Sequence, residues 1–243
     1  MPPCLRGERG FKLNAYLHIP FCTSICSYCD FTSFAGQESK IASYVDALCS
    51  EIGDSSLAGP LQTVYFGGGT PSLLPPEKLG QVLKALRLKA GFEPEAEISM
   101  EANPETVDLE RLKSYRGLGI NRLSFGAQAF QKEILRKLGR GHEWDRVEQA
   151  YQDARGAGFE NINLDLMFGL SGQTLEMFRT SVEKAISLKP VHLSLYAFQV
   201  HQDMADGGRG NIHFFGNDLR SHRFGRGHIG MDDRGKDVFF AFL

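Results

Sequence analysis

Three cysteines lie within eight residues, in the run Cys22-Thr-Ser-Ile-Cys26-Ser-Tyr-Cys29. Thiolates are soft ligands that select zinc, copper(I) or iron–sulfur clusters, so three of them on one short loop predict a metal site. A structural zinc ion usually takes four protein ligands, and His18 is the nearby residue that could be the fourth. A disulfide with a spare thiol is another alternative. The total of five cysteines is odd, which argues against the paired framework of a secreted protein.

A [4Fe-4S] cluster fits the three cysteines in a different way. Four irons with three cysteine ligands leave one iron open to bind a substrate or a cofactor. The other two cysteines have no part in this prediction. Cys49 lies on the apolar side of a predicted helix and is expected to be a small core residue, and Cys4 near the N-terminus has no predicted role.

Glycines and a carboxylate lie at the ends of two further predicted strands. The run Gly67-Gly68-Gly69-Thr70-Pro71 follows the second strand, where residues without side chains let backbone N–H groups approach a ligand. Glu101 ends the third strand, where a carboxylate could bind a ribose hydroxyl. The alternatives are a bare glycine turn, and for Glu101 a solvated strand end or the start of a helix.

The later strands carry polar residues in apolar surroundings. Asp165 lies in Asn-Leu-Asp-Leu-Met-Phe, and because burying an unpaired carboxylate is costly we expect it to meet a ligand or a cation. Arg140 could pair with that aspartate or with a carboxylate ligand, and a solvated surface position is the alternative. Gln128 follows the fourth strand.

The elements that must position these residues alternate between short strands and amphipathic helices. Runs rich in β-branched and aromatic residues predict six strands, at about 13–19, 61–66, 96–101, 121–126, 160–166 and 191–198. Apolar residues at spacings of three and four predict helices between them. These faces are Ile41/Tyr44/Val45/Leu48/Ile52, Leu79/Val82/Leu83/Leu86, Leu109/Leu112/Tyr115 and Leu175/Phe178/Val182/Ile186.

Alternating strands and helices predict an α/β fold with a parallel sheet and right-handed crossovers. Six such units make either an open doubly wound sheet or an incomplete barrel, and in both the ligands gather at the C-terminal ends of the strands. We expect residues 1–12 to be an N-terminal extension, 13–200 the core domain and 201–243 an irregular, aberrant tail. That tail holds four of the seven histidines and shows no helix or strand period.

The run Tyr16-Leu-His-Ile-Pro-Phe-Cys22 and the two cysteines after it resemble the cluster motif of radical S-adenosylmethionine (SAM) proteins. More narrowly, the chain is similar to the family of oxygen-independent coproporphyrinogen III oxidases and their relatives, the haem chaperones. The resemblance runs from about residue 13 to 200 and rests on several separated motifs. It implies an incomplete (β/α)6 barrel of the TIM type with a [4Fe-4S] cluster and SAM as cofactors.

In that family the open iron chelates the methionine part of SAM, and an electron from the cluster cleaves SAM to a 5′-deoxyadenosyl radical. The resemblance implies SAM contacts for Gly68, Gly69, Thr70 and Glu101, and cavity positions for Gln128, Arg140 and Asp165. Tyr16 and Tyr28 match positions near bound SAM, although they could instead shield the cluster from water. His18 and His142 are expected to be hydrogen-bonded structural residues.

Two departures from the family bear on function. The oxidases carry a further cysteine two positions after the third ligand, where this chain has Phe31, which favours the chaperone branch. The resemblance also ends at about residue 200, so we expect the chain to lack the family's C-terminal domain with its His-Asn-x-x-Tyr-Trp segment; the single tryptophan is Trp144. We therefore expect a haem chaperone in porphyrin and haem metabolism, with the porphyrinogen oxidase and an inactive truncated form as alternatives.

The composition narrows the partners. With 27 basic and 29 acidic residues, the net charge is -2, and no Lys/Arg-rich cluster predicts nucleic-acid binding. No apolar run predicts membrane insertion, and the first ten residues lack a secretory signal. The expected partners are SAM, a porphyrin or haem, an electron-donor protein and a second copy in a dimer. The expected location is the cytoplasm, with an organelle as the alternative.

Overall fold

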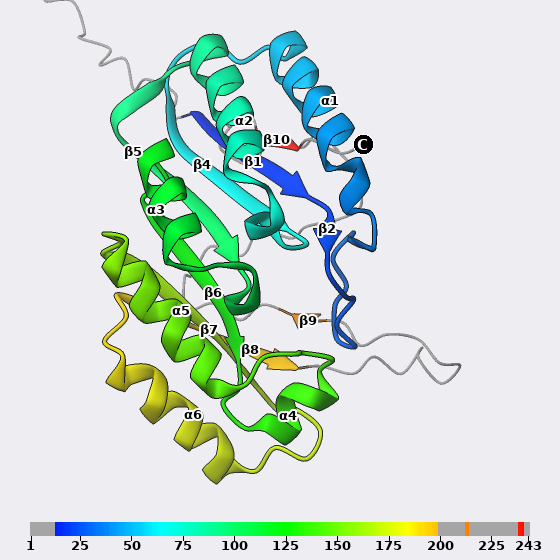
Figure 1. Ribbon diagram of the computed structural model, residues 1–243, viewed down its shortest axis with the longest axis vertical. Helices are drawn as coiled ribbons and strands as arrows, with labels where there is room; N and C mark the ends of the chain where they lie inside the picture. The colour runs from blue at the N-terminus through cyan, green and yellow to red at the C-terminus, as the bar shows by residue number, and fades with distance from the viewer. Residues whose placement is uncertain (1–12, 199–211, 214–237, 241–243) are drawn as a thin grey trace, which may run out of the picture.

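A computed structural model describes residues 13–198, 212–213 and 238–240. Its elements alternate along the chain as the sequence predicts (Figure 1). The strands are β1 Leu13–Ile19, β2 Phe21–Cys22, β3 Phe34–Ala35, β4 Leu61–Gly68, β5 Phe92–Ala102, β6 Arg122–Gln128, β7 Asn161–Phe168, β8 His192–Phe198, β9 Ile212–His213 and β10 Val238–Phe240. The α-helices are α1 Ile41–Asp54, α2 Pro76–Lys89, α3 Leu109–Leu118, α4 Lys132–Lys137, α5 Trp144–Gly156 and α6 Leu175–Ser187.

Six of these strands form one parallel sheet in the order β1-β4-β5-β6-β7-β8. Each strand lies beside the one before it, and at least one α-helix occupies each crossover. Among the described residues no pairing joins the two ends of the sheet, so the barrel is incomplete. The predicted fold class is confirmed.

Short strands extend both edges of this sheet. β10 pairs in parallel with β1, and β9 pairs antiparallel with β8. The sequence predicted neither strand. The rest of the predicted tail, like the N-terminal extension 1–12, lies outside the described residues.

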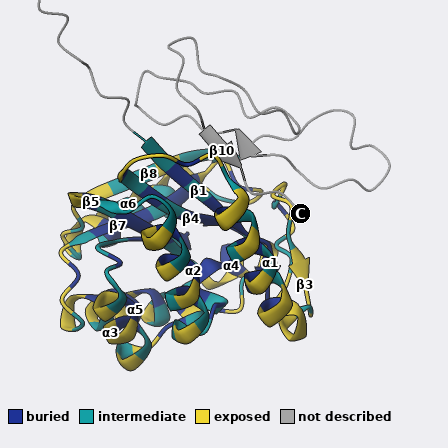
Figure 2. Ribbon diagram, turned by 90° about the horizontal axis from the view of Figure 1, so that it is seen from above, coloured by how far each residue is buried: buried dark blue, intermediate teal, exposed yellow. Residues whose placement is uncertain are grey.

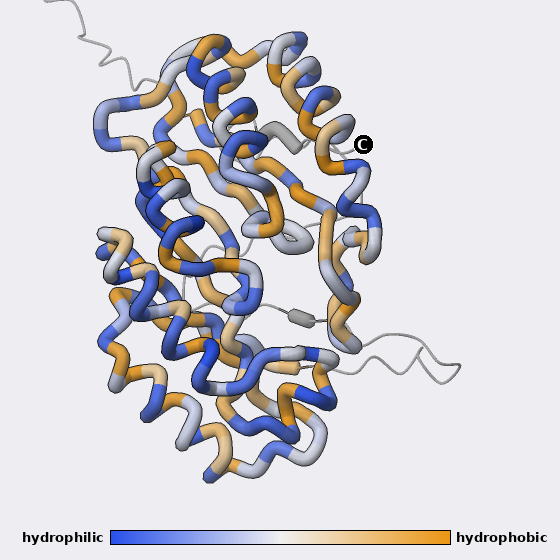
Figure 3. The backbone as a smooth tube through the Cα atoms, in the orientation of Figure 1, coloured by the Kyte–Doolittle hydropathy of each residue, from blue (hydrophilic) through white to orange (hydrophobic). Residues whose placement is uncertain are grey.

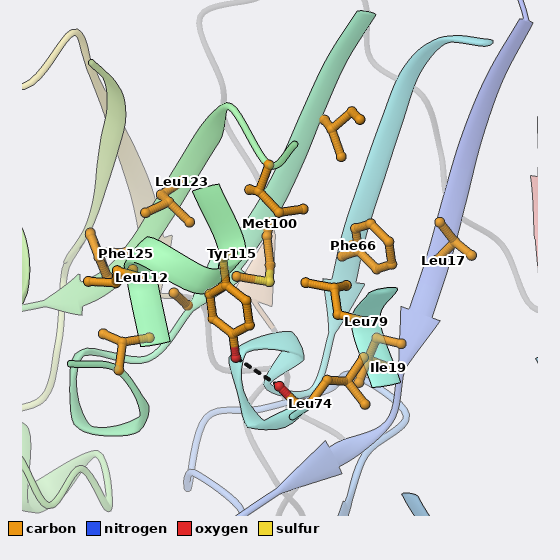
Figure 4. Packing of buried hydrophobic residues seen from close by; sticks show 14 of the residues in the cluster. Leu17, Ile19, Phe66, Leu74, Leu79, Met100, Leu112, Tyr115, Leu123 and Phe125 are labelled. Carbon is orange, nitrogen blue, oxygen red and sulfur yellow. Dashed lines mark hydrogen bonds between the residues drawn. The ribbon is translucent and has the colours of Figure 1, made fainter. Parts of the chain in front are cut away.

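The helices pack on one face of the sheet, and the core fills the space between the two layers (Figure 2). Leu17, Phe66, Met100 and Phe125 point from successive strands toward α2 and α3 (Figure 4). The hydroxyl of the buried Tyr115 donates to the carbonyl of Leu74 at 2.8 Å, so its one polar atom is satisfied inside the core. Apolar residues follow the strands and the inner sides of the helices (Figure 3).

Alternate residues of the same strands are polar and face away from the helices. Side chains alternate between the faces of a strand, so the neighbours of the apolar core residues form the other face. On that face Asn163 donates to Ser124 and Ser194, and Thr63 donates to Asn14. A face this polar is built to border water or a ligand rather than a second apolar layer.

Two details differ from the sequence prediction. The predicted apolar face of α6 is wrong at Leu175 and Ile186, which are 83% and 56% exposed. The helix instead buries Ser181 and Ala185, and the Ser181 hydroxyl accepts from the backbone N–H of Phe130 and donates to Gln131. Helices α4 and α5 were not predicted, although the buried residues of α5 have the usual spacing.

None of the helices described could span a membrane, being too short or too polar.

Candidate functional site

The three clustered cysteines lie on the loop that follows β1. Cys22 ends β2 and is buried, while Cys26 and Cys29 are half-buried in the turn beyond it. The backbone N–H of Cys29 donates to the carbonyl of Cys26, and Ser27 donates from its N–H to the carbonyl of Leu138. The midpoint of the cysteine loop is thus attached to the end of α4. The cysteines described by the structure, these three and Cys49, are free thiols, which leaves no disulfide among them.

A cavity of about 130 Å³ opens beside this loop at the C-terminal ends of the strands. All but one of the predicted site residues line it. They are Cys22, Cys26, Cys29, Tyr28, Gly68, Gly69, Thr70, Glu101, Gln128, Arg140 and Asp165. Tyr16 is the exception: it lies on the polar face of β1, where its ring stacks on Tyr65 and its hydroxyl bonds the Nδ1 of His18 at 3.1 Å.

The glycine run at the end of β4 is hydrogen-bonded to the segment that leads into the cysteine loop. A side chain at Gly69 would place its Cβ 2.8 Å from the carbonyl oxygen of Phe21 and 3.0 Å from the Sγ of Cys22, so only glycine fits there. The Thr70 hydroxyl donates to the same sulfur at 3.5 Å. The N–H groups of residues 68–70 donate to Glu101, Ile19 and Phe21, so they are not free for a ligand as the sequence suggested.

Glu101 is held by two donors at the cavity wall. The Tyr65 hydroxyl donates to its Oε1 at 2.7 Å and the Gly68 N–H donates to its Oε2 at 3.1 Å. Burial raises the pKa of Glu101 to about 7, with the charge of Asp165 adding to the effect and the two hydrogen bonds opposing it. This carboxyl can therefore change its charge near neutral pH.

Asp165 has no cationic partner among the residues that the structure describes. Its carboxylate accepts from Ser124 at 3.0 Å, from the Asn163 amide at 2.7 Å and from the Tyr196 hydroxyl at 3.3 Å. Burial raises the pKa of Asp165, and its hydrogen bonds oppose that shift. Of the two alternative partners expected for Arg140, this aspartate or a ligand carboxylate, the first is not observed, because polar side chains of β6, β7 and β8 surround Asp165 instead.

Arg140 contacts the cysteine loop. Its Nε and Nη2 donate to the Tyr28 hydroxyl at 3.0 and 2.5 Å, and its guanidinium lies 5.7 Å from the Tyr28 ring centroid. Burial lowers the pKa of Arg140, but the neighbouring Tyr28 and Cys26 raise it by a larger amount. The pKa is therefore raised overall, and the arginine keeps its charge. The cavity thus has a cation beside the cysteines, and its lining also carries the carboxyl groups of Glu101, Glu105 and Asp165.

Sequence reasoning missed two tyrosines of this site. Tyr65 bonds Glu101, and Tyr196 bonds Asp165 while also lining the cavity. Both lie on the polar face of their strands. Tyr65 precedes the first residue of the glycine run by two, so counting every second residue back from that motif would have found it, whereas no motif lies on the strand of Tyr196.

The zinc alternative is not supported. Both ring nitrogens of His18 are engaged, with Nε2 2.7 Å from the carbonyl oxygen of Thr32 and Nδ1 3.1 Å from the Tyr16 hydroxyl. Within the described part of the chain, no three His, Cys, Asp or Glu side chains are placed to hold a single metal ion. Thiolates that bind three different irons of a cluster need not converge on one point.

Comparison with known proteins gives a consistent result. The family model described as "Radical SAM superfamily" matches residues 16–185. The chain is 42% identical over 191 residues to "Heme chaperone HemW" of Bacillus subtilis, covering 77% of this chain and 50% of that protein. The protein of the same name from Escherichia coli is 39% identical, with coverage of 81% and 53%. The chain therefore spans about half the length of these relatives.

A solved structure supports the same relationship. It is described as "Coproporphyrinogen III oxidase (HemN) from Escherichia coli is a Radical SAM enzyme" and matches with a TM-score of 0.74 at 32% identity. The match covers 80% of this chain and 46% of that one. Methylornithine synthase (PylB), at 17% identity and a TM-score of 0.55, shares the fold.

Proposed function

The chain belongs to the radical SAM superfamily, and we propose that it is a haem-chaperone-type member that holds a [4Fe-4S] cluster and SAM. Cys22, Cys26 and Cys29 would hold the cluster, with Glu101, Gln128, Arg140 and Asp165 facing SAM. The observation that carries the proposal is the single cavity that these residues share. When bound, the cluster and SAM supply a carbon radical; the protein supplies their binding and orientation.

The donor set fits an iron–sulfur cluster. Three thiols on one loop match its ligand requirement and leave one iron open. Within this loop the buried Tyr28 packs in one apolar cluster with Ile134, Leu135 and Met167. Aromatic and aliphatic cover on one side of a cluster limits the access of water to it.

The charges of the cavity fit SAM. SAM carries a positive sulfonium and ammonium beside one carboxylate, and the cavity offers one guanidinium and three carboxyl groups, those of Glu101, Asp165 and the more exposed Glu105. Glu101 and Asp165 have raised pKa values without a cation beside them, so a cationic ligand would favour their charged forms. Arg140, on the side of the cysteines, is suited to a ligand carboxylate.

Two observations favour the chaperone over the oxidase. Phe31 stands where the oxidases have a further cysteine, and it lines the cavity with 43% of its surface exposed. The curated relatives at 39–44% identity are named haem chaperones. Decarboxylation of a porphyrinogen propionate is the second candidate, and a core that binds the cluster without further activity is the third. A cytoplasmic location, an electron-donor protein and a dimer belong to the proposal.

Anaerobic reconstitution with iron and sulfide tests the cluster. We expect about four irons per chain and broad thiolate-to-iron absorption, with both lost in Cys26→Ala and kept in the matched Cys49→Ala variant. Reduction with SAM should then yield 5′-deoxyadenosine, and haem titration should saturate at a fixed ratio to protein. Iron bound equally well by Cys26→Ala would refute the site. Haem that fails to co-elute with folded protein would refute the chaperone.

A further inference from the structure

Strand β6 ends in a tight turn with a left-handed residue at its centre. The φ of Gln128 is 62°, and the N–H of Ala129 donates to the carbonyl of Ala127 at 2.8 Å, which closes a three-residue turn. Side chains disfavour this conformation, and such γ-turns are rare and strained. Among the described residues only Lys189, just after α6, is another non-glycine with a positive φ.

The turn determines where the Gln128 side chain lies. Gln128 is buried and lines the cavity, and a Cβ at Gly126 would come within 2.8 Å of its amide nitrogen. The same Cβ would lie 3.5 Å from the Nη2 of Arg140. The absence of a side chain at Gly126 therefore lets the amide fold back beside the guanidinium in the cavity wall.

His142 contacts this turn from the loop between α4 and α5. Its imidazole is buried, and its Nε2 lies 3.4 Å from the carbonyl oxygen of Ala127, the oxygen that closes the turn. A carbonyl only accepts, so Nε2 carries the proton. Nδ1 has no partner and is the one such buried side-chain nitrogen or oxygen in the described part of the chain.

The ring stays neutral in this position. Burial lowers the pKa of His142 to about 4, with the charge of Arg140 adding to the effect. A neutral imidazole with one unused nitrogen and one weak hydrogen bond contributes little as core packing alone. A strained turn at the cavity residue Gln128 and an unsatisfied acceptor on His142, which contacts that turn, together point to a role for this pair.

We infer that His142 is a positioning residue: its Nε2–H holds the Ala127 carbonyl and so keeps Gln128 in the left-handed turn that aims its amide into the cavity. The inference rests on the proposed function for the identity of the ligand, SAM. The part of the inference that concerns the backbone, in which His142 keeps the turn at Gln128 in place, does not depend on any ligand.

Ligand binding tests the role of His142 in the cluster-loaded full chain. His142→Phe keeps a ring but loses the donor, and we expect the Kd for SAM to rise about tenfold, as for one lost hydrogen bond at the ligand. His142→Gln, whose amide supplies a donor, should restore most of the affinity. In a Gln128→Ala background His142→Phe should cause no further loss. A full additional loss there would show that His142 acts only through packing.

Thermal unfolding without cluster or SAM tests the turn. Gln128→Gly should melt about 2–4 °C above Gln128→Ala, because glycine accepts the positive φ without strain. Tyr151→Phe, which keeps a ring on α5 and removes only a hydroxyl that donates to the Lys189 carbonyl, is the control for His142→Phe and should leave SAM affinity unchanged. Equal melting temperatures for the two Gln128 variants would overturn the strained turn. Absence of SAM binding by the unmodified chain would overturn the proposed function and leave this result standing.

Discussion

Glu101 and Asp165 are held in the cavity wall by hydroxyl, amide and N–H donors, and within the described ranges no cationic side chain pairs with either. Their charge state therefore depends on what fills the cavity. In the free protein burial dominates and raises the pKa of both carboxyls. A cationic ligand reverses that balance, so binding and proton release are coupled at these two residues.

The Glu101→Gln variant should change how stability depends on pH. The folded-state pKa of about 7 exceeds the ordinary value of 4.5, so between these values the folded protein binds a proton that the unfolded chain has lost. Stability is then highest below pH 4.5 for this group and falls as pH rises to about 7. The variant should lose this decline and gain up to about 3 kcal/mol at pH 8. Urea denaturation of the variant and the unmodified chain at pH 6 and pH 8 measures the change in unfolding free energy with pH. An equal change in both proteins would contradict the prediction.

The Tyr65→Phe variant should shift the pH range in which SAM binds. Its hydroxyl stabilises the charged form of Glu101, so without it the pKa of Glu101 rises further. SAM affinity should then reach its plateau at a higher pH than in the unmodified chain, as measured by equilibrium dialysis across pH 6–9. Tyr44→Phe, which removes a hydroxyl bonded to the His18 carbonyl, is the control. Identical profiles for both variants would exclude the proposed role of Tyr65.

At the scale of elements, α6 differs most from expectation. Neighbouring residues of this helix lie in opposite environments, since Ala185 is fully buried and Ile186 is 56% exposed. The small side chains at Ser181 and Ala185 let the helix approach the structure beneath it closely. Apolar character at Ile186 therefore says nothing about its burial.

A matched pair of substitutions tests this arrangement of α6. Ala185→Leu should destabilise the protein by about 1–3 kcal/mol through overpacking. Ile186→Gln should change stability by less than about 0.5 kcal/mol, because it alters an exposed position. Urea denaturation of the two variants gives both values. The reverse order would mean that α6 is rotated about its axis.

Sequence periodicity predicted the elements best where one face is apolar and the other polar. Strand β1 has the predicted bounds, because Ala15, Leu17 and Ile19 alternate with polar or aromatic residues. Strand β5 begins at Phe92, earlier than predicted, through Glu93 and Glu95, which are exposed and carry no apolar signal. Hydrogen bonds between distant strands, such as those that surround Asp165, have no local pattern, so its partners could not be predicted.

At the scale of the whole molecule, the sheet has a buried centre and a less buried margin. β5 and β6 each carry several buried residues, whereas every residue of β8 is exposed or half-buried. Local opening needs less free energy where few apolar groups are buried. The centre of the sheet and its β8 edge therefore differ in local stability.

Hydrogen exchange should reveal this gradient. We expect the amides of β8 to exchange at least about tenfold faster than those of β5 and β6 in the cluster-free protein. Mass spectrometry of peptides that cover 192–198 and 96–102 measures the difference. Uniform protection across the sheet would show that β8 is covered as well as the centre.

The hydrogen bond from Ser27 to Leu138 joins the cysteine loop to the end of α4, two residues before Arg140. One short connection therefore fixes both the three cysteines proposed to hold the cluster and the cation of the cavity. Loss of iron and loss of a bound carboxylate should both disturb the same part of the chain, the cysteine loop with the segment 138–140. The cysteine loop and the segment 138–140 therefore form one mechanical unit, and a displacement of either one is transmitted to the other.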